Sequence, residues 1–221
     1  MSLDVGAPLN ELSPQLRHLV RCTDEVAQRE AWRLRYTAYR SAGAIQEDPS
    51  ETFCDEFDRQ PNCRTYLLRS GRRAIGSIRI CRKLPNALLP SETIWPAEVA
   101  NKVPSEVATL EINRFVTDPG LDRGLGRIAA LLFRAVIAEA TVQQAAWLLA
   151  AVRRDHVWFY EQVLEMSVMG EAKPYHGLRT EMFLMGVHFP SAWPSVAARF
   201  PAMNLSGSEI EQFTRQGVHR C

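Results

Sequence analysis

The chain has 221 residues, of which 46% are hydrophobic and 23% charged, as is ordinary for one soluble globular domain with at most a small appendage. The formal net charge of +1 argues against nucleic acid as the main partner. No apolar run approaches the roughly 18 residues that a membrane span needs. The N-terminus also lacks the basic and apolar regions of a signal peptide, so we expect a cytoplasmic protein.

The cysteines suggest a reducing compartment. They are five in number, contain no CxxC pair and lie in a chain large enough to bury a core without disulfides. We therefore predict free thiols and no metal site.

The charges are unevenly distributed along the chain. Residues 23–58 contain nine acidic residues against four arginines, whereas residues 64–83 contain seven basic residues and no acidic one. Two such segments either form solvated faces that pair with each other, or the basic segment docks an acidic partner. The sequence leaves both interpretations open.

Hydrophobic spacing and turn residues predict the elements in chain order. Residues 1–22 form an arm with one short helix near residues 15–20, and a helix that begins at 23–25 fades by residue 43. The expected elements after it are an acidic loop at 44–63, a hairpin of strands at 65–68 and 74–80, a proline-rich segment at 83–106 with a helical turn near 95–99, a strand from 108, a helix at about 122–141, a strand at 146–152, a helix at 157–164 and closing strands at 167–170 and 180–187. This order predicts a mixed α/β sheet in a domain at 23–189, followed by an extension at 190–221 with one helix after Ser208.

The segment 108–127 is where we expect the chemistry. Ala108, Leu110 and Ile112 alternate with polar residues as in a strand, which ends at a Thr-Asp-Pro-Gly turn. Gly124 and Gly126 then lead into an apolar helix. Free backbone N–H groups and the helix dipole make such a turn a phosphate site. The sequence thus predicts a phosphate-bearing donor at the turn, with the reaction beside the strand.

Four short motifs between residues 35 and 116 occur in an order that is specific when they are taken together, and three more follow them along the chain. They are Arg35-x-x-x-Tyr39, Asp55-Glu56-Phe57-Asp58, Gly76-Ser77-Ile78-Arg79, Glu111-Ile112-Asn113-Arg114-Phe115-Val116, Gly124-x-Gly126, Phe159-Tyr160-Glu161 and Tyr175-His176-Gly177. On these motifs the chain resembles the GNAT acyltransferase superfamily, and within it the acyl-homoserine-lactone synthases and the long-chain N-acyl amino acid synthases. The resemblance spans about residues 24–188. It implies a GNAT-like fold of α/β (α+β) class, with a mostly antiparallel mixed sheet between helices in three layers.

Departures from the family patterns favour one of these two groups of synthases over the other. Asn113 stands where the lactone synthases carry serine, and no tryptophan follows the first helix before the acidic loop. Together with the Tyr-His-Gly motif, these changes favour an N-acyl amino acid synthase. Leu121 stands where GNAT proteins carry Gln or Arg before the first glycine, which favours a carrier-borne pantetheine over free coenzyme A.

Acyl transfer to an amine needs a proton acceptor and a proton donor. Glu111 is the candidate base, or else only a structural ion-pair partner of Arg79 or Arg114. Tyr160 is the candidate acid for the leaving thiolate, or else a core aromatic residue. His156 is either a base or, as we favour from the sequence, a structural residue.

The remaining candidates bind the substrates. The resemblance implies that Asp55 and Asp58 bind the ammonium group of the acceptor and that arginines bind its carboxylate, although some arginines must instead satisfy the acids around them. The residues expected at the acceptor are Arg35, Tyr39, Asp55, Asp58, Arg79, Asn113 and Arg114. The residues expected at the donor are Phe115, Val116, Arg123, Gly124, Leu125, Gly126 and Arg127, with Arg134 nearby.

We therefore expect an N-acyltransferase that moves a fatty acyl group from a thioester, on acyl carrier protein or coenzyme A, to the amine of a small acceptor, preferably an amino acid. The alternatives are a lactone synthase that uses S-adenosylmethionine in quorum sensing and a non-catalytic acyl-thioester-binding module. The alkyl chain is expected in an apolar cleft lined from residues 83–106. Acyl carrier protein is the expected protein partner, because its acidic surface suits a basic rim at the turn.

Overall fold

The computed structural model describes residues 18–121 and 124–215. Seven strands form one sheet in the order β1-β2-β3-β4-β5-β7-β6, in which only β4 and β5 pair in parallel among the described residues. The strands are β1 His18–Arg21, β2 Cys63–Ser70, β3 Arg73–Arg82, β4 Thr109–Thr117, β5 Trp147–Arg153, β6 Ser167–Pro174 and β7 Glu181–His188. The α-helices are α1 Glu25–Ser41, α2 Pro96–Lys102, α3 Leu125–Val142, α4 Val157–Leu164, α5 Phe189–Arg199 and α6 Gly207–Arg215. Short 3-10 turns are η3 Glu56–Arg59, η4 Pro90–Thr93, η5 Arg154–His156 and η6 Pro201–Met203.

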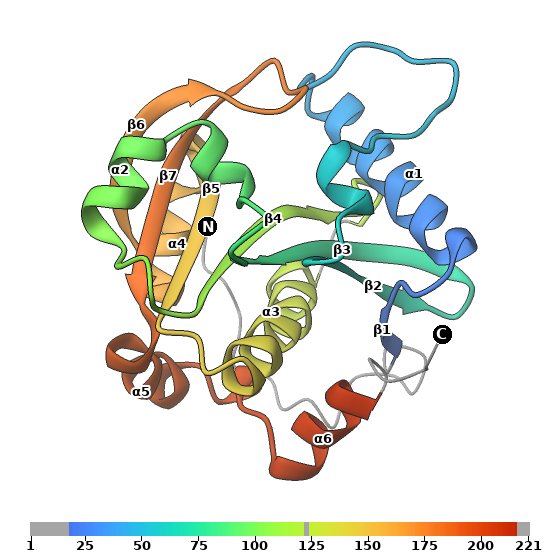
Figure 1. Ribbon diagram of the computed structural model, residues 1–221. Coiled ribbons are helices and arrows are strands. Elements are labelled where there is room, and N and C mark those ends of the chain that lie inside the picture. The colour runs from blue at the N-terminus through green and yellow to red at the C-terminus, as the bar shows by residue number, and fades with distance from the viewer. Residues whose placement is uncertain (1–17, 122–123, 216–221) are drawn as a thin grey trace.

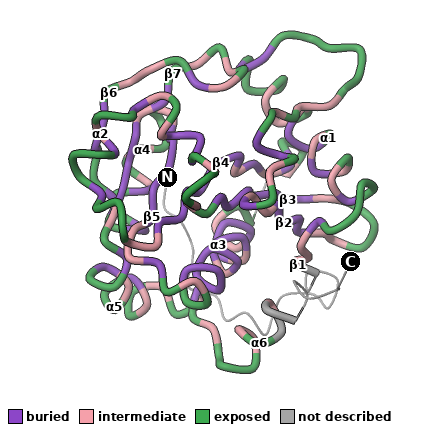
Figure 2. The backbone as a smooth tube through the Cα atoms, in the orientation of Figure 1, coloured by how far each residue is buried: buried purple, intermediate pink, exposed green. Residues whose placement is uncertain are grey.

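Helices cover both faces of this sheet (Figure 1). Because side chains alternate along a strand, Leu148 and Ala150 of β5 pack in the core under α3 and α4, whereas Leu149 packs in a second cluster under α2. Leu67 of β2 joins a third cluster under α1. The central strands are accordingly buried along most of their length (Figure 2). The expected mostly antiparallel mixed sheet in three layers is confirmed.

Two sequence predictions about the ends of the chain are wrong. The short helix expected near residues 15–20 is replaced, from His18 onward, by β1, which pairs antiparallel with β2; residues 15–17 lie outside the described part. The C-terminal extension contains α5 as well as the expected helix after Ser208. Pro194 inside α5 disguises this helix in the sequence. The domain boundaries at residues 22/23 and 189/190 stay a prediction.

The cysteines also differ from expectation. Cys63 and Cys81 form a disulfide between β2 and β3, where the two residues lie directly opposite each other. Free thiols are therefore the wrong prediction for this pair, whereas Cys22 and Cys54 are free. No three His, Cys, Asp or Glu side chains are grouped as metal ligands in the described ranges, and none of the described helices has the length and apolar character to cross a membrane.

Candidate active site

The two parallel strands separate at the centre of the sheet. Pairing between β4 and β5 stops at Ile112 and Ala150, although β4 continues to Thr117 and β5 to Arg153. Beyond this point a cleft of about 300 Å³ lies between them, lined by residues 113–117 and 151–153 of the two strands and by side chains from α1, α4 and β7. The facing strand edges have no ladder partner there, so their backbone groups can bind an extended amide-bearing ligand.

Strand β4 is irregular where it lines this cleft. Arg114 has a φ of 51°, in the left-handed region that a non-glycine residue rarely adopts, and the register against β3 shifts between Ser77 and Arg79. The bulge places Asn113 and Arg114 in consecutive positions of the lining. Both are buried.

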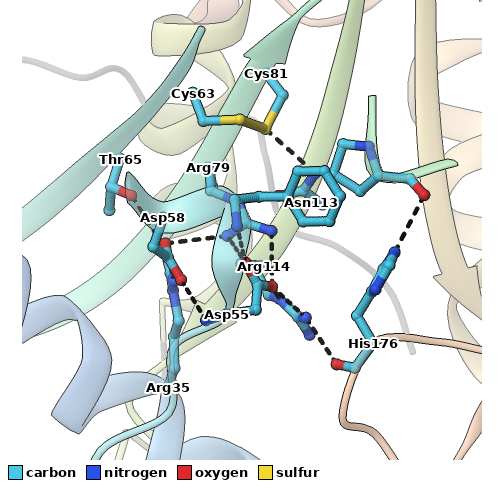
Figure 3. A network of polar contacts seen from close by, with 12 residues as sticks. Arg35, Asp55, Asp58, Cys63, Thr65, Arg79, Cys81, Asn113, Arg114 and His176 are labelled. Atoms are coloured by element: carbon cyan, nitrogen blue, oxygen red, sulfur yellow. Dashed lines mark hydrogen bonds and ion pairs between the residues drawn. A yellow bond between two sulfur atoms is a disulfide. The ribbon is translucent and has the colours of Figure 1, made fainter. Parts of the chain in front are cut away.

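The acidic loop supplies two carboxylates to the same region. Asp55 caps the 3-10 turn η3 by accepting a hydrogen bond from Phe57 N, and Asp58 accepts one from Asp55 N. This reciprocal cap fixes both carboxylates relative to the backbone. Each then faces arginines from other elements of the sheet and α1 (Figure 3).

The acids and arginines expected at the acceptor form one connected network (Figure 3). Arg79 Nη1 lies 2.5 Å from Asp55 Oδ1 and 3.1 Å from Asp58 Oδ1, and Arg79 Nε donates to Asn113 Oδ1 at 2.7 Å. Arg114 Nη2 lies 2.5 Å from Asp55 Oδ2. Arg35 Nη1 lies 2.6 Å from Asp58 Oδ1. The expectation that some arginines satisfy the neighbouring acids therefore holds.

Burial and charge together set the ionisation of this network. Burial alone raises the pKa of Asp55, but the hydrogen bonds and charges of Arg79 and Arg114 outweigh it and hold the pKa well below its usual range. The pKa of Asp58 is lowered in the same way, against its burial, by Arg35 and Arg79. Three guanidinium groups thus face two ionised carboxylates, which leaves one positive charge in excess. Binding of an ammonium group by either aspartate, which stays a prediction, would require one of these pairs to open.

Glu111 lies beside this network but outside its ion pairs. Its carboxylate is fully buried and accepts hydrogen bonds from Ser91 N at 2.8 Å, Tyr175 Oη at 3.0 Å and Asn113 Nδ2 at 3.2 Å. Burial raises its pKa above the usual value despite these donors. The ion pair with Arg79 or Arg114 that the sequence left open does not occur among the described residues.

The Tyr-His-Gly motif covers this part of the site. Tyr175 reaches Glu111, as described above, while the His176 ring contacts Thr93 Oγ1 at 3.0 Å and Pro90 O at 3.2 Å. The His176 carbonyl accepts a hydrogen bond from Arg114 Nη2 at 2.8 Å. The motif therefore connects η4, which donates to Glu111, with the arginine that lines the cleft.

Two tyrosines meet the cleft from opposite faces of the sheet. Tyr39 comes from α1 and Tyr160 from α4, and both line it. Tyr160 also packs against Phe133 with ring centroids 6.1 Å apart, so it is a core aromatic residue and a cleft residue at once. Burial raises its pKa above the usual value, so the phenol keeps its proton at neutral pH.

The structure adds His156 to the cleft, and whether it is a base or a structural residue stays a prediction. It lies four residues before Tyr160 and lines the same cleft. Burial lowers the pKa of its imidazole, against the charge of Asp155, and Arg153 Nη2 lies 3.2 Å from its Nε2. A histidine at helical spacing from the expected tyrosine is the signal that could have placed it here.

The expected donor residues divide into two groups. Phe115 and Val116 line the cleft, and Gly124 caps α3 in a left-handed conformation with a φ of 79° and no side-chain cap. Residues 124–127 are not part of the described cleft lining, which reaches Pro119. Arg123 lies outside the described residues. Arg134 is ion-paired with Glu209 of α6 and so does not serve the rim of the turn.

A protein-family model described as "N-acyl amino acid synthase FeeM" matches residues 30–188. The chain belongs to this family. It is therefore an acyltransferase, an enzyme that transfers an acyl group to nitrogen, and the resemblance drawn from its sequence is confirmed. A comparison with curated proteins gives no match.

Solved structures share the fold of this FeeM-family enzyme. FeeM itself, an N-acyl amino acid synthase from uncultured soil microbes, superposes with a TM-score of 0.70 at 20% identity, over 83% of this chain and 97% of that one. The coenzyme A-dependent acyl-homoserine lactone synthase BjaI, with SAM and isopentyl-CoA, gives 0.63 at 14% identity, over 89% and 98%. The acyl-homoserine-lactone synthase LasI gives 0.59 at 16% identity, over 79% and 92%.

Proposed function

We propose that this enzyme joins a fatty acyl group to the amine of an amino acid, and that Arg114 binds the carboxylate of that acceptor. The excess positive charge of the buried network carries this proposal. Arg114 lines the cleft, and its Nη1 is buried without a hydrogen-bond partner. An unpaired buried donor costs about 1–3 kcal/mol, so an anionic ligand that pairs with it is favoured. Arg35 and Arg79 are not in the described lining.

The donor is an acyl thioester on phosphopantetheine, which the separated edges of β4 and β5 would bind as an extended chain. We favour acyl carrier protein over coenzyme A, for two reasons. Leu121 lacks the polar side chain expected before the glycine turn. Arg127, at the start of α3, has no ion-pair partner among the described residues and suits an acidic carrier. Such a donor is consistent with a cytoplasmic enzyme.

The reaction forms a C–N bond and breaks a C–S bond. The amine nitrogen attacks the thioester carbonyl carbon and gives up a proton, and the departing thiolate takes up one. Tyr160, protonated and in the cleft, is the proposed proton donor to the thiolate. Glu111 is the proposed base, and because it is fully buried and does not line the cleft it would take the proton through a water molecule.

A thiol-release assay tests the proposal with one acyl-pantetheine donor and paired acceptors. An amino acid and its carboxamide are similar in shape but differ in the charge that Arg114 would bind. We expect the wild type to prefer the acid by roughly 10- to 100-fold in kcat/KM, as for a hydrogen bond to a charged group. Arg114→Gln should abolish this preference, whereas Arg59→Gln, an exposed arginine next to the network, should retain it. Equal rates for acid and carboxamide in the wild type would contradict the assignment.

S-adenosylmethionine belongs in the same acceptor panel, because it carries both an amine and a carboxylate. Mass spectrometry of the products separates the two outcomes. An acyl amino acid supports the proposed function, and a homoserine lactone formed from S-adenosylmethionine would replace it.

A further inference from the structure

The cleft adjoins a second buried layer. Ala151 and Met182 line the cleft and also belong to the hydrophobic cluster under α2, and Leu178 lines the cleft and packs against that cluster. The layer lies between α2 and the strands β5, β7 and β6 (Figure 1). Three apolar side chains are thus shared by the cleft and the layer.

Trp95 is a large buried member of this layer. Its ring is fully buried, and its Nε1 donates to the carbonyl of Glu171 at 2.9 Å. It fits because Gly170 has no side chain: a Cβ there would lie 2.7 Å from Trp95 Cδ1. Gly186 makes room for Met169 in the same way. Two strand glycines therefore let large side chains fill the layer.

The cleft alone is small for the substrates of the proposed function. Its volume of about 300 Å³ is at the low end of small-molecule pockets, which measure roughly 300–1,000 Å³. The thioester group and an amino acid must both enter it. A fatty acyl chain therefore needs further apolar space.

The two faces of the sheet differ in how they close the cleft. Toward α3, Phe115 stacks on Phe133 and Phe133 on Phe159, with ring centroids 5.4 and 5.9 Å apart. Toward α2, the closing residue is Met182, whose unbranched side chain has three rotatable bonds and repacks easily. Met169 lies behind it in the same cluster. The layer is filled in this structure, so a chain enters it only where Met182 and Met169 repack.

We propose that Met182 is the gate that sets acyl-chain selectivity: the chain passes Met182 into the layer under α2, and Trp95 limits its length. This inference rests on the proposed function. It also gives the proline-rich segment 83–106 the role of an acyl-site wall that the sequence suggested.

A series of saturated acyl-pantetheine donors from four to sixteen carbons tests the gate in the thiol-release assay. Met182→Ala should shift the optimum toward longer chains, with the ratio of kcat/KM for long over short donors rising about 15-fold for each two methylenes newly buried. Met182→Phe should shift it toward shorter chains. A ratio within one variant is insensitive to how much of that variant folds.

Met185→Ala is the matched control. Met185 lies on the same strand, is also buried and faces the opposite core. Met185→Ala removes the same side-chain atoms as Met182→Ala and should keep the wild-type preference for acyl-chain length. An unchanged preference in active Met182→Ala and Met182→Phe would overturn the gate and leave the proposed function standing. An absence of thiol release by the wild type with every donor would overturn the proposed function and the gate with it.

Discussion

Asp55 and Arg114 form a partly buried ion pair, with Arg114 Nη2 2.5 Å from Asp55 Oδ2, and the other oxygen of the same carboxylate binds Arg79 at 2.5 Å. One carboxylate thus pairs with two guanidinium groups that come from neighbouring strands. Arg114 lines the cleft, and these ion pairs do not saturate its guanidinium group, since Nη1 has no hydrogen-bond partner. Asp55 is therefore the residue on which the charge of the proposed acceptor site depends.

Asp55→Asn should destabilise the protein by about 3–5 kcal/mol, because it leaves buried guanidinium charge without its counterion. Urea unfolding at pH 7 measures this loss. Since the folded-state pKa of Asp55 is depressed, its contribution is present above the unfolded pKa of about 3.9 and is lost as pH falls through the folded value. The difference in free energy of unfolding between wild type and variant should therefore shrink only in strongly acidic solution.

Glu56→Gln is the control for this prediction. Glu56 is the next residue of the same turn, and it is exposed. Its substitution should change the free energy of unfolding by no more than about 0.5 kcal/mol. Equal and small effects of the two substitutions would mean that the network is not the buried counterion system described above.

The members of this site were predictable from the sequence, but their pairing was not. Asp55, Arg79 and Arg114 were expected together because they lie in motifs of known order. Asp55 is separated from Arg79 by 24 residues and from Arg114 by 59. A sequence does not show whether charges so far apart bind each other or a substrate. The burial of Glu111 was equally hidden, because its donors Ser91 and Tyr175 come from other segments.

The fold was predictable where a periodic hydrophobic pattern extended over many residues. The alternation on β4 and the helical period of α3 gave elements close to those observed. Strand β1 is only four residues long and is held by its pairing with β2, which local propensity does not encode. The Cys63–Cys81 pair depends on the hairpin register in the same way.

Glu111 should make the fold less stable as pH rises. Its folded-state pKa is raised above the unfolded value of about 4.3, so between these two values the native state holds the extra proton. The free energy of unfolding then falls with increasing pH over that window. The glutamine of Glu111→Gln does not titrate. Unfolding curves at several pH values should therefore show the variant becoming more stable relative to the wild type as pH rises through this window. A pH-independent difference would contradict the raised pKa.

The same variant separates catalysis from positioning. As a base, Glu111 contributes roughly 10²–10⁴-fold to the rate, so Glu111→Gln should lower kcat by at least about 100-fold while KM for the acceptor changes little. A rise in KM with kcat retained would instead assign Glu111 the role of holding Asn113 in the cleft.

Tyr160→Phe should lower kcat by about 100-fold or more without lowering the melting temperature, because the ring that packs against Phe133 and Phe159 is kept and only the hydroxyl is lost. The defect should depend on the leaving group. An alkyl thiolate such as pantetheine needs a proton as it departs, whereas an aryl thiolate of low pKa does not, so aryl thioesters should restore most of the lost rate. Tyr36→Phe removes a hydroxyl whose one hydrogen-bond partner within the described ranges is Asp48 N, and it should behave as wild type. A Tyr160→Phe defect of equal size with alkyl and aryl thioesters would mean that the hydroxyl orients the substrate and does not protonate the thiolate.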